Sequence, residues 1–366
     1  IFQGGYRMKR PKAVALLSGG LDSTLAVLIM LREGVDVTAV TFLTHFGCDI
    51  TDSSSCSRDP LPAANKYGFE LKLCHLADKF LEIVKNPKYG HGKNMNPCID
   101  CRILMLKEAK TLMELIGADF VVTGEVLGQR PMSQRRQCFP LIDREAGLEG
   151  LVLRPLSAKL LPPTIPEQKG LVNRENLYAI KGRSRKAQMA LAEEFGLEDY
   201  PSPAGGCLLT DPIYSWRLRD LLEQNPDPSI KEIQLLRVGR HFRLNPTCKA
   251  IVGRNKMENE QILALAEEGD TLVRVPNVGS PVTILSGQCD ENAIVLVAGI
   301  TARYSDARHQ KEVSVLVYSK TTAGYTLKVS PLDNETIEAL RIAPPENTRK
   351  SKRRKPRREL SEVYNQ

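Results

Sequence analysis

The stretch "ALLSGGLDS", residues 15–23, joins a short apolar run to the start of an apolar helical pattern. Its glycine pair permits a tight turn whose N–H groups can face an anion, and the following helix adds the positive end of its dipole. No lysine follows the glycines, which excludes the loop G-x-x-x-x-G-K-[ST]. Asp22 is suited to hold Mg²⁺ against pyrophosphate. The expected phosphate ligands are Ser18, Gly19, Gly20, Asp22, Ser23 and Thr24.

Short β-branched runs alternate with helical patterns on both sides of this turn, from residue 12 to about residue 125. The runs "AVALL", "VDVTAVTF" and "ADFVVTGE" predict strands, and residues 23–34 and 100–116 predict helices. This order is typical of an α/β fold, and we expect a doubly wound, mostly parallel sheet. Ligands bind such sheets at the carboxyl ends of the strands, which makes Gly124 a further candidate nucleotide contact.

The length of 366 residues predicts two or three domains. We expect residues 1–7 to be a remnant outside the fold, residues 8–212 to form the nucleotide-binding domain and residues 213–228 a linker helix. Residues 229–340 alternate strand and helix patterns and predict an α+β domain. Residues 341–366 carry nine basic and three acidic residues, +6 of the net charge of +8. This composition predicts a disordered arm for a polyanion.

No stretch approaches the roughly 18 apolar residues of a membrane span, so we expect no membrane contact. No export signal is seen, and a cytoplasmic compartment would keep the nine cysteines as thiols or ligands. Six of the cysteines are scattered, and we interpret them as packing or incidental thiols. They are Cys48, Cys56, Cys74, Cys138, Cys248 and Cys289.

The other three cysteines form a constellation. Cys98 and Cys101 have C-x-x-C spacing after Pro97, where a helix should begin and lower the pKa of both thiols. Cys207 follows a glycine pair in "SPAGGCLLT". Three thiolates with an open fourth position suit a [4Fe-4S] cluster. A persulfide on Cys207 that Cys98 resolves as a disulfide needs no metal, and structural zinc is a third alternative.

The turn "SGGLDS" matches the SGG-x-D-S signature of the PP-loop ATP pyrophosphatases. This resemblance implies cleavage of ATP to AMP and pyrophosphate, with adenylation of a carbonyl oxygen. The segments "NPCIDCR", "GADFVVTGE" and "GGCLL" resemble those of the tRNA 2-thiouridine synthases, and the 4-thiouridine synthases use the same chemistry. By this resemblance Cys98 and Cys207 are the sulfur-carrying pair, and Cys101 completes the trio of cluster-dependent thiolases. The similarity spans residues 12–212.

The sequence departs from that family at two places. Glu125 stands where the family's T-G-H-Y-A-R motif has histidine. The substrate contacts that this loop makes in the family therefore cannot be assigned to the loop of this chain. No THUMP domain is recognisable before the turn, so another unit should hold RNA. The pieces "RHF" and "VGRN" resemble the RNA-binding module of NFACT proteins over residues 231–330. There we expect one basic face for phosphate contacts and stacking, formed by Arg237, Arg240, His241, Phe242, Arg243, Lys249, Arg254 and Lys256.

These observations predict a cytoplasmic tRNA thiouridine synthase that binds ATP and Mg²⁺. Sulfur would come from sulfide or from a cysteine desulfurase persulfide, and the oligomeric state stays open, with a homodimer as one option. Arg154 and Lys159 are candidates for stabilising the developing pyrophosphate charge. Two alternatives remain, namely an amide synthetase that uses ammonia and a non-catalytic RNA-binding factor that senses ATP.

Overall fold

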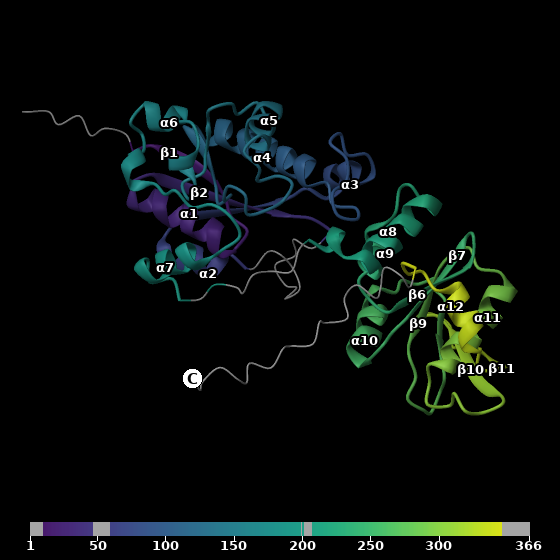
Figure 1. Cartoon of the computed structure of the whole chain (residues 1–366). Helices are drawn as coiled ribbons and strands as arrows, with labels where there is room; N and C mark the ends of the chain where they lie inside the picture. Colours follow the sequence, from purple (N-terminus) through teal and green to yellow (C-terminus); the bar gives the residue numbers. More distant parts are fainter. Residues whose placement is uncertain (1–9, 47–58, 199, 201–206, 346–366) are drawn as a thin grey trace, which may run out of the picture. The chain divides into compact units, whose positions relative to one another are not determined.

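The computed structural model describes residues 10–46, 59–198, 200 and 207–345. The chain divides into two compact units after Asp211, and each is described by itself (Figure 1). Residues 1–7, expected to stand outside the fold, lie outside the described residues, as do Cys48, Cys56 and the predicted basic arm beyond residue 345. No helix of the described residues is long and apolar enough to cross a membrane.

The first unit is built on a five-stranded sheet with the order β3-β2-β1-β4-β5, and all of its strands are parallel. The strands are β1 (Lys12–Leu16), β2 (Asp36–Leu43), β3 (Glu70–His75), β4 (Phe120–Thr123) and β5 (Val152–Leu153). The strand order reverses between β1 and β4, and ligands of open α/β sheets bind at such a switch point. The predicted doubly wound α/β fold is confirmed.

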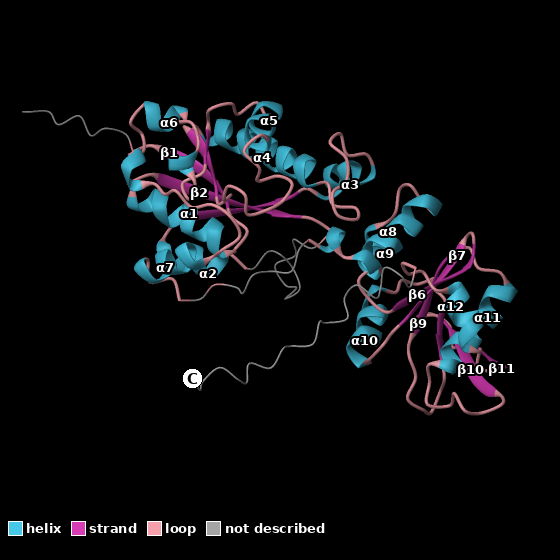
Figure 2. Ribbon diagram, viewed as in Figure 1, coloured by secondary structure: helices cyan, strands magenta, loops and turns pink. Residues whose placement is uncertain are grey.

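Helices cover both faces of this sheet; Figure 2 shows α1 and α7 on one side and α4 and α5 on the other. The helices are α1 (Leu21–Arg32), α2 (Leu61–Tyr67), α3 (Ala77–Lys85), α4 (Cys98–Ile116), α5 (Cys138–Glu145), α6 (Ile165–Gln168) and α7 (Lys186–Glu194). Short 3-10 helices occupy Ala158–Leu160, Arg174–Asn176 and Leu208–Thr210. Helix α1 buries nine of its twelve residues, so its first turn is held rigidly beneath the predicted phosphate-binding site.

The second unit is a six-stranded antiparallel sheet with the order β11-β10-β8-β9-β7-β6. Its strands are β6 (Arg240–Asn245), β7 (Cys248–Val252), β8 (Leu272–Arg274), β9 (Thr283–Gly287), β10 (Val313–Tyr318) and β11 (Tyr325–Val329). Its helices are α8 (Pro212–Gln224), α9 (Ile230–Leu235), α10 (Lys256–Leu265), α11 (Glu291–Arg303) and α12 (Asn334–Leu340). The predicted α+β second domain is confirmed, and α8, where the sequence predicts a linker helix, belongs to this unit.

Alternating residues of β7 face two separate cores. Ala250 and Val252 lie in one core, which includes apolar residues of α11, and Ile251 lies in another with Leu235 and Ile262 of α9 and α10. This alternation is the period of two expected for a strand with both faces covered.

Two sequence-based expectations for the second unit are wrong. The run "IQLLRVGRHFRL", residues 233–244, is predicted as a strand, but its first three residues end α9, because Ser229 and Glu232 make a capping box at the start of this helix. Cys248 and Cys289, interpreted as incidental thiols, form a disulfide. The pairing of β7 with β9 places Cys248 opposite Gly287, two residues before Cys289. Their separation of 41 residues conceals this proximity in the sequence.

Candidate active site

A cavity of about 310 Å³ lies at the carboxyl ends of β1 and β2, on the side where the strand order reverses. Its wall contains the turn after β1, the start of α4 and the loop after β4. Asp22 of the turn lines this cavity together with Cys98, Cys101 and Cys207. The structure therefore brings the predicted phosphate-binding turn and the three predicted sulfur ligands to one site.

The turn has the geometry of an anion site. Gly19 adopts a φ of 68°, the left-handed conformation that glycine tolerates best. Gly20 caps α1 without any side-chain cap, which leaves the first N–H groups of the helix for a ligand. Ser18 and Ser23 lie on the cavity wall with their hydroxyl oxygens 3.2 Å apart. Thr24 does not line the cavity, and its buried hydroxyl donates to the Gly20 carbonyl oxygen, as the Ser23 hydroxyl also does.

Asp22 carries the feature that points to a metal ion in the turn. Its Oδ2 accepts a hydrogen bond of 2.9 Å from Nε2 of Gln129. Its Oδ1 is buried and has no hydrogen-bond partner among the described residues. A buried carboxylate oxygen without a partner is costly, and Mg²⁺ is the kind of hard cation that such an oxygen binds. The residue present therefore fits the predicted Mg²⁺.

Gly124 follows β4 and lies on the cavity wall, in contact with the turn. A Cβ atom added there would lie 2.5 Å from both Cα and N of Ser23. Backbone atoms cannot approach a methyl group so closely without moving. Gly124 thus permits β4 and the first turn of α1 to pack backbone against backbone.

Cys207 lies 109 positions after Cys98 in the sequence, and backbone contacts hold its segment close to the start of α4. The Met95 N–H donates to the Leu209 carbonyl over 3.1 Å, and the Asn94 side chain donates to the Thr210 carbonyl over 2.7 Å. Met95 and Asn94 come just before Cys98. These two hydrogen bonds place the third cysteine at the cavity, and no spacing in the local sequence indicates this.

The pKa of Cys98 contradicts the expectation of a thiolate. Burial raises the pKa of this thiol above its ordinary value, while Arg102, a hydrogen bond with Asn96 and Arg130 act in the opposite direction. The cost of desolvating a thiolate thus exceeds the help from Arg102, Asn96 and Arg130. An anionic sulfur at Cys98 therefore depends on the neighbouring arginines.

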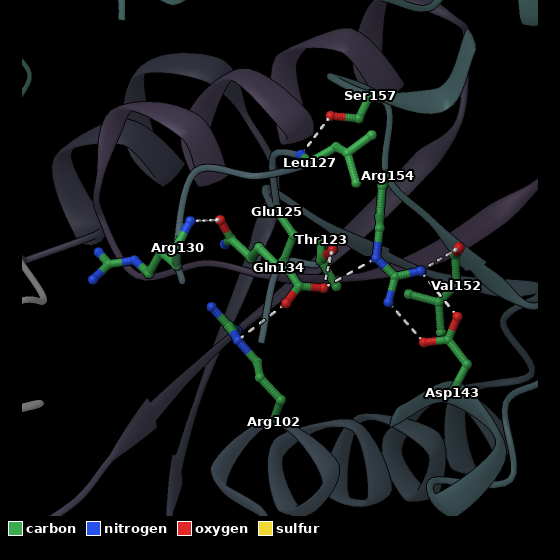
Figure 3. Close-up of polar contacts among 10 residues, drawn as sticks. All are labelled: Arg102, Thr123, Glu125, Leu127, Arg130, Gln134, Asp143, Val152, Arg154 and Ser157. Atoms are coloured by element: carbon green, nitrogen blue, oxygen red, sulfur yellow. Dashed lines mark hydrogen bonds and ion pairs between the residues drawn. The ribbon is translucent and has the colours of Figure 1, made fainter. Parts of the chain in front are cut away.

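Glu125 organises a buried ionic network behind this wall (Figure 3). It is 1% exposed, and its carboxylate meets Nε of Arg154 at 3.1 Å and Nε of Arg102 at 3.3 Å. Arg154 is itself 3% exposed and is held by both oxygens of Asp143, at 2.9 and 2.7 Å. Arg102 lines the cavity, and its charge acts on Cys98 and Cys101. The network therefore connects the buried pair of Arg154 and Asp143 to a cation that faces the two thiols.

The predicted role of Arg154 at pyrophosphate is therefore wrong, because its guanidinium is buried in ion pairs. Lys159 does not line the cavity either; its Nζ donates to the Glu175 carbonyl over 2.7 Å. The cations on the wall are instead Arg102, Arg130 and Arg185. Arg130 and Gln129 come from the loop after Glu125, whose functional contacts the resemblance left open.

Cys98, Cys101 and Cys207 are the candidate ligands of a metal group. Among the described residues, no three His, Cys, Asp or Glu side chains converge closely enough to hold one metal ion. Cluster cysteines bind separate irons and therefore lie farther apart than the ligands of a single ion. Their soft sulfur donors and their shared cavity fit a cluster, whereas a mononuclear structural zinc site is not formed by the described residues.

The basic face predicted for the second unit does not form as expected. Phe242, His241 and Lys249 are all buried, at 0%, 1% and 3% exposure. Phe242 therefore cannot stack on a base, and burial lowers the pKa of His241 well below its ordinary value. Arg243 is paired with Asp220. The strand pattern of β6 and β7 directs these side chains into the unit, which their spacing in the sequence did not reveal.

Comparisons with known proteins agree with this two-part organisation. Residues 9–159 match the family described as "Thiamine biosynthesis protein (ThiI)", and residues 239–341 match the "NFACT protein RNA binding domain". The predicted PP-loop domain and NFACT-type RNA-binding domain are thus confirmed.

Similar individual proteins cover only parts of the chain. A tRNA-specific 2-thiouridylase from Leptospira interrogans is 28% identical over 32% of the chain and 34% of its own length. A probable tRNA sulfurtransferase from Thermococcus kodakarensis is 32% identical over 32% of the chain and 30% of its own length. The chain spans about a third of the length of these relatives. A solved 4-thiouridine synthetase in complex with RNA and ATP is 22% identical, with a TM-score of 0.32, over 61% of this chain and 52% of that one.

Proposed function

We propose that this protein is a cytoplasmic, ATP-dependent tRNA thiouridine synthase. One observation carries the proposal: a single cavity is lined by Asp22, whose buried Oδ1 has no hydrogen-bond partner among the described residues, and by Cys98, Cys101 and Cys207. Nucleotide activation and sulfur delivery need to reach the same carbon atom, and a shared cavity permits both. The confirmed RNA-binding module supplies a reason for tRNA as the substrate.

The first step is adenylation. ATP lies with its phosphates on the turn, where Ser18, Gly19, Gly20 and Ser23 would contact them and Asp22 would hold Mg²⁺, which neutralises phosphate charge when bound. The uracil carbonyl oxygen attacks the α-phosphorus, the new O–P bond forms, and the bond to pyrophosphate breaks. Arg130 and Arg185 are placed on the wall to stabilise the charge of the departing pyrophosphate. The target uridine has to leave its stack to reach this cavity.

The second step replaces AMP by sulfur. The persulfide of a cysteine desulfurase first transfers its outer sulfur to the Cys207 thiolate, and the donor cysteine leaves as a thiol. The Cys207 persulfide attacks the adenylated carbon through its terminal sulfur, the C–S bond forms, and AMP leaves with the oxygen. The Cys98 thiolate then attacks the Cys207 sulfur, so that a Cys98–Cys207 disulfide forms and thiouridine is released. A thiol reductant has to restore both cysteines. Arg102 stabilises the anionic form of Cys98.

A [4Fe-4S] cluster is the alternative sulfur carrier. Cys98, Cys101 and Cys207 would hold it, and it would supply a soft iron site for exogenous sulfide. Iron and sulfide analysis after anaerobic purification decides between the routes. About four irons per chain, lost in Cys98→Ala, Cys101→Ala and Cys207→Ala, support the cluster. A protein without iron that thiolates tRNA supports the persulfide.

The test of the function itself uses the full chain with a tRNA transcript, ATP, Mg²⁺ and a thiol reductant. Parallel reactions receive either sulfide or a cysteine desulfurase with cysteine, and thiouridine is measured by mass spectrometry together with pyrophosphate. Asp22→Ala should abolish both products. Cys207→Ala should abolish thiouridine and retain RNA-dependent pyrophosphate release. Cys74→Ala is the matched control, because this half-buried cysteine does not line the cavity and should retain activity. Full thiolation by Asp22→Ala or Cys207→Ala would contradict the mechanism.

A further inference from the structure

A second pocket, of about 790 Å³, lies in the antiparallel unit, where segments distant in sequence meet. Its wall includes the start of β6, the turn before α10, the loop before β9, the end of α11 and the start of α12. The positively charged residues on this wall are Arg240, Arg254, Lys256, Arg303 and Arg308. Asp306 is the only carboxylate among the lining residues. A concave wall with this charge focuses a positive potential.

Arg240 is held in place before any ligand arrives. Its guanidinium lies 4.5 Å from the centre of the Tyr304 ring, a cation–π contact. The Tyr304 hydroxyl in turn accepts a hydrogen bond of 2.8 Å from Arg341. The guanidinium orientation is thus set by an aromatic ring that is itself tied to the fold, which reduces the entropy lost when an anion binds.

The charge of Arg240 is not balanced by the protein. Among the described residues it forms no ion pair, and it lies near the cations Arg254 and Arg341. Burial and these like charges lower its pKa below the ordinary value, the direction expected for an uncompensated cation. The negative charge of Glu258 acts in the opposite direction, but this carboxylate is bound to Arg254. A bound anion would offset this repulsion.

Neutral groups of the wall complete a site for phosphate oxygens. Asn255, Asn259, Ser280 and Asn334 contribute amide and hydroxyl groups. Such groups, together with arginines, make most contacts between proteins and the nucleic-acid backbone. Arg240 covers the face of Tyr304, which leaves His309 as the one further aromatic side chain among the described residues of a wall with five cations and four amide or hydroxyl groups. The site therefore suits phosphates better than bases.

We propose that this pocket binds consecutive phosphates of the tRNA backbone and anchors the RNA during thiolation. The inference rests on the proposed function for the identity of the RNA, and it assigns the contact to residues that lie apart in the sequence. It replaces the predicted face around Phe242. Arg303 and Arg308, at the end of α11, are as much part of the site as Arg240.

The test is tRNA binding by the full chain at several salt concentrations, measured by fluorescence anisotropy. Arg240→Gln and Arg303→Gln should each weaken binding about tenfold at low salt and reduce the slope of log K against log[salt] by about 1. Lys320→Gln removes an exposed cation outside the pocket and should change neither quantity. Arg240→Lys keeps the charge and should preserve the slope, which a purely structural role of Arg240 would not.

The outcomes for this pocket and for the proposed enzyme are separable. Wild-type affinity and salt slope in Arg240→Gln and Arg303→Gln, with thiouridine still formed, would overturn the pocket and leave the enzyme function intact. The other result is that these variants lose tRNA binding while the wild type forms no thiouridine under any condition. That result would support the proposed RNA-binding role of the pocket and contradict the proposed enzyme function. Unfolding followed by fluorescence of Trp216, the single tryptophan and a residue of this unit, verifies that the variants are folded.

Discussion

Substitution of Gly124 by alanine tests the contact between β4 and the phosphate-binding turn. The new methyl group would lie 2.5 Å from Cα and N of Ser23 and 2.6 Å from the carbonyl carbon of Asp22. Ordinary carbon contacts are about 3.5 to 4.0 Å, so the backbone of the turn or of β4 has to move by about 1 Å. The atoms that must move are those that hold the N–H groups and the carboxylate for ATP and Mg²⁺.

The expected effects follow from this displacement. Overpacking of this kind costs about 1–3 kcal/mol, which should lower the unfolding free energy of the first unit by that amount. A displacement of 1 Å in a positioned site reduces turnover about 100-fold. We expect Gly124→Ala to bind ATP at least about tenfold more weakly in isothermal titration calorimetry, by the same loss of alignment. The Trp216 fluorescence transition, which reports on the second unit, should stay unchanged.

Gly117→Ala is the matched control. Gly117 ends α4 with a φ of 62°, and a Cβ there would meet nothing within 4 Å. Its alanine variant loses about 1–2 kcal/mol to left-handed strain and leaves the turn in place. It should bind ATP like the wild type. If Gly124→Ala also binds ATP like the wild type while its stability falls, then the proposed link between β4 and the phosphate-binding turn is refuted.

Three further predictions concern buried charges. Arg102→Gln should raise the pKa of Cys98 above its value in the wild type, because the Arg102 guanidinium lowers this pKa. The pH profile of Cys98 alkylation by iodoacetamide measures the change. An unchanged profile would count against the role of Arg102. Glu125→Gln should destabilise the first unit by about 3–5 kcal/mol, since it leaves two arginines facing one remaining carboxylate. Denaturation followed by circular dichroism measures this loss of unfolding free energy. A loss below about 1 kcal/mol, typical of an exposed ion pair, would contradict the prediction. Burial lowers the pKa of Lys249 to about 8. The unfolded chain therefore binds more protons between pH 8 and about 10.5, so the stability of the second unit should rise with pH in that window. Lys249→Met should remove this rise and stabilise the unit at pH 7, as measured by Trp216 fluorescence; an equal rise in both proteins would show that Lys249 is not its cause.

The errors of sequence-based prediction have two causes. Residues 233–235 look like a strand by hydrophobicity, yet the capping box of Ser229 and Glu232 starts a helix, and this local signal was available. No comparable signal marked the burial of Phe242 and Lys249. Whether a side chain on a strand faces solvent depends on what covers each face of the sheet, and that is decided by α8, α9 and α11 elsewhere in the chain.

The amino-acid sequence alone determined the features that arise from neighbouring residues. The order of apolar periods predicts the α/β sheet, and the glycine pair followed by a helix predicts the anion-binding turn, because both depend on local backbone conformation. Tertiary structure decided what meets this turn. The contacts of Met95 and Asn94 bring Cys207 to the cavity that Cys98 lines. The guanidinium of Arg154 lies outside the cavity wall, because it is buried in an ion pair with Glu125. Tertiary structure also assembled the basic pocket from five separate segments. Such proximity follows from strand register and burial over the whole unit, which sequence spacing does not encode.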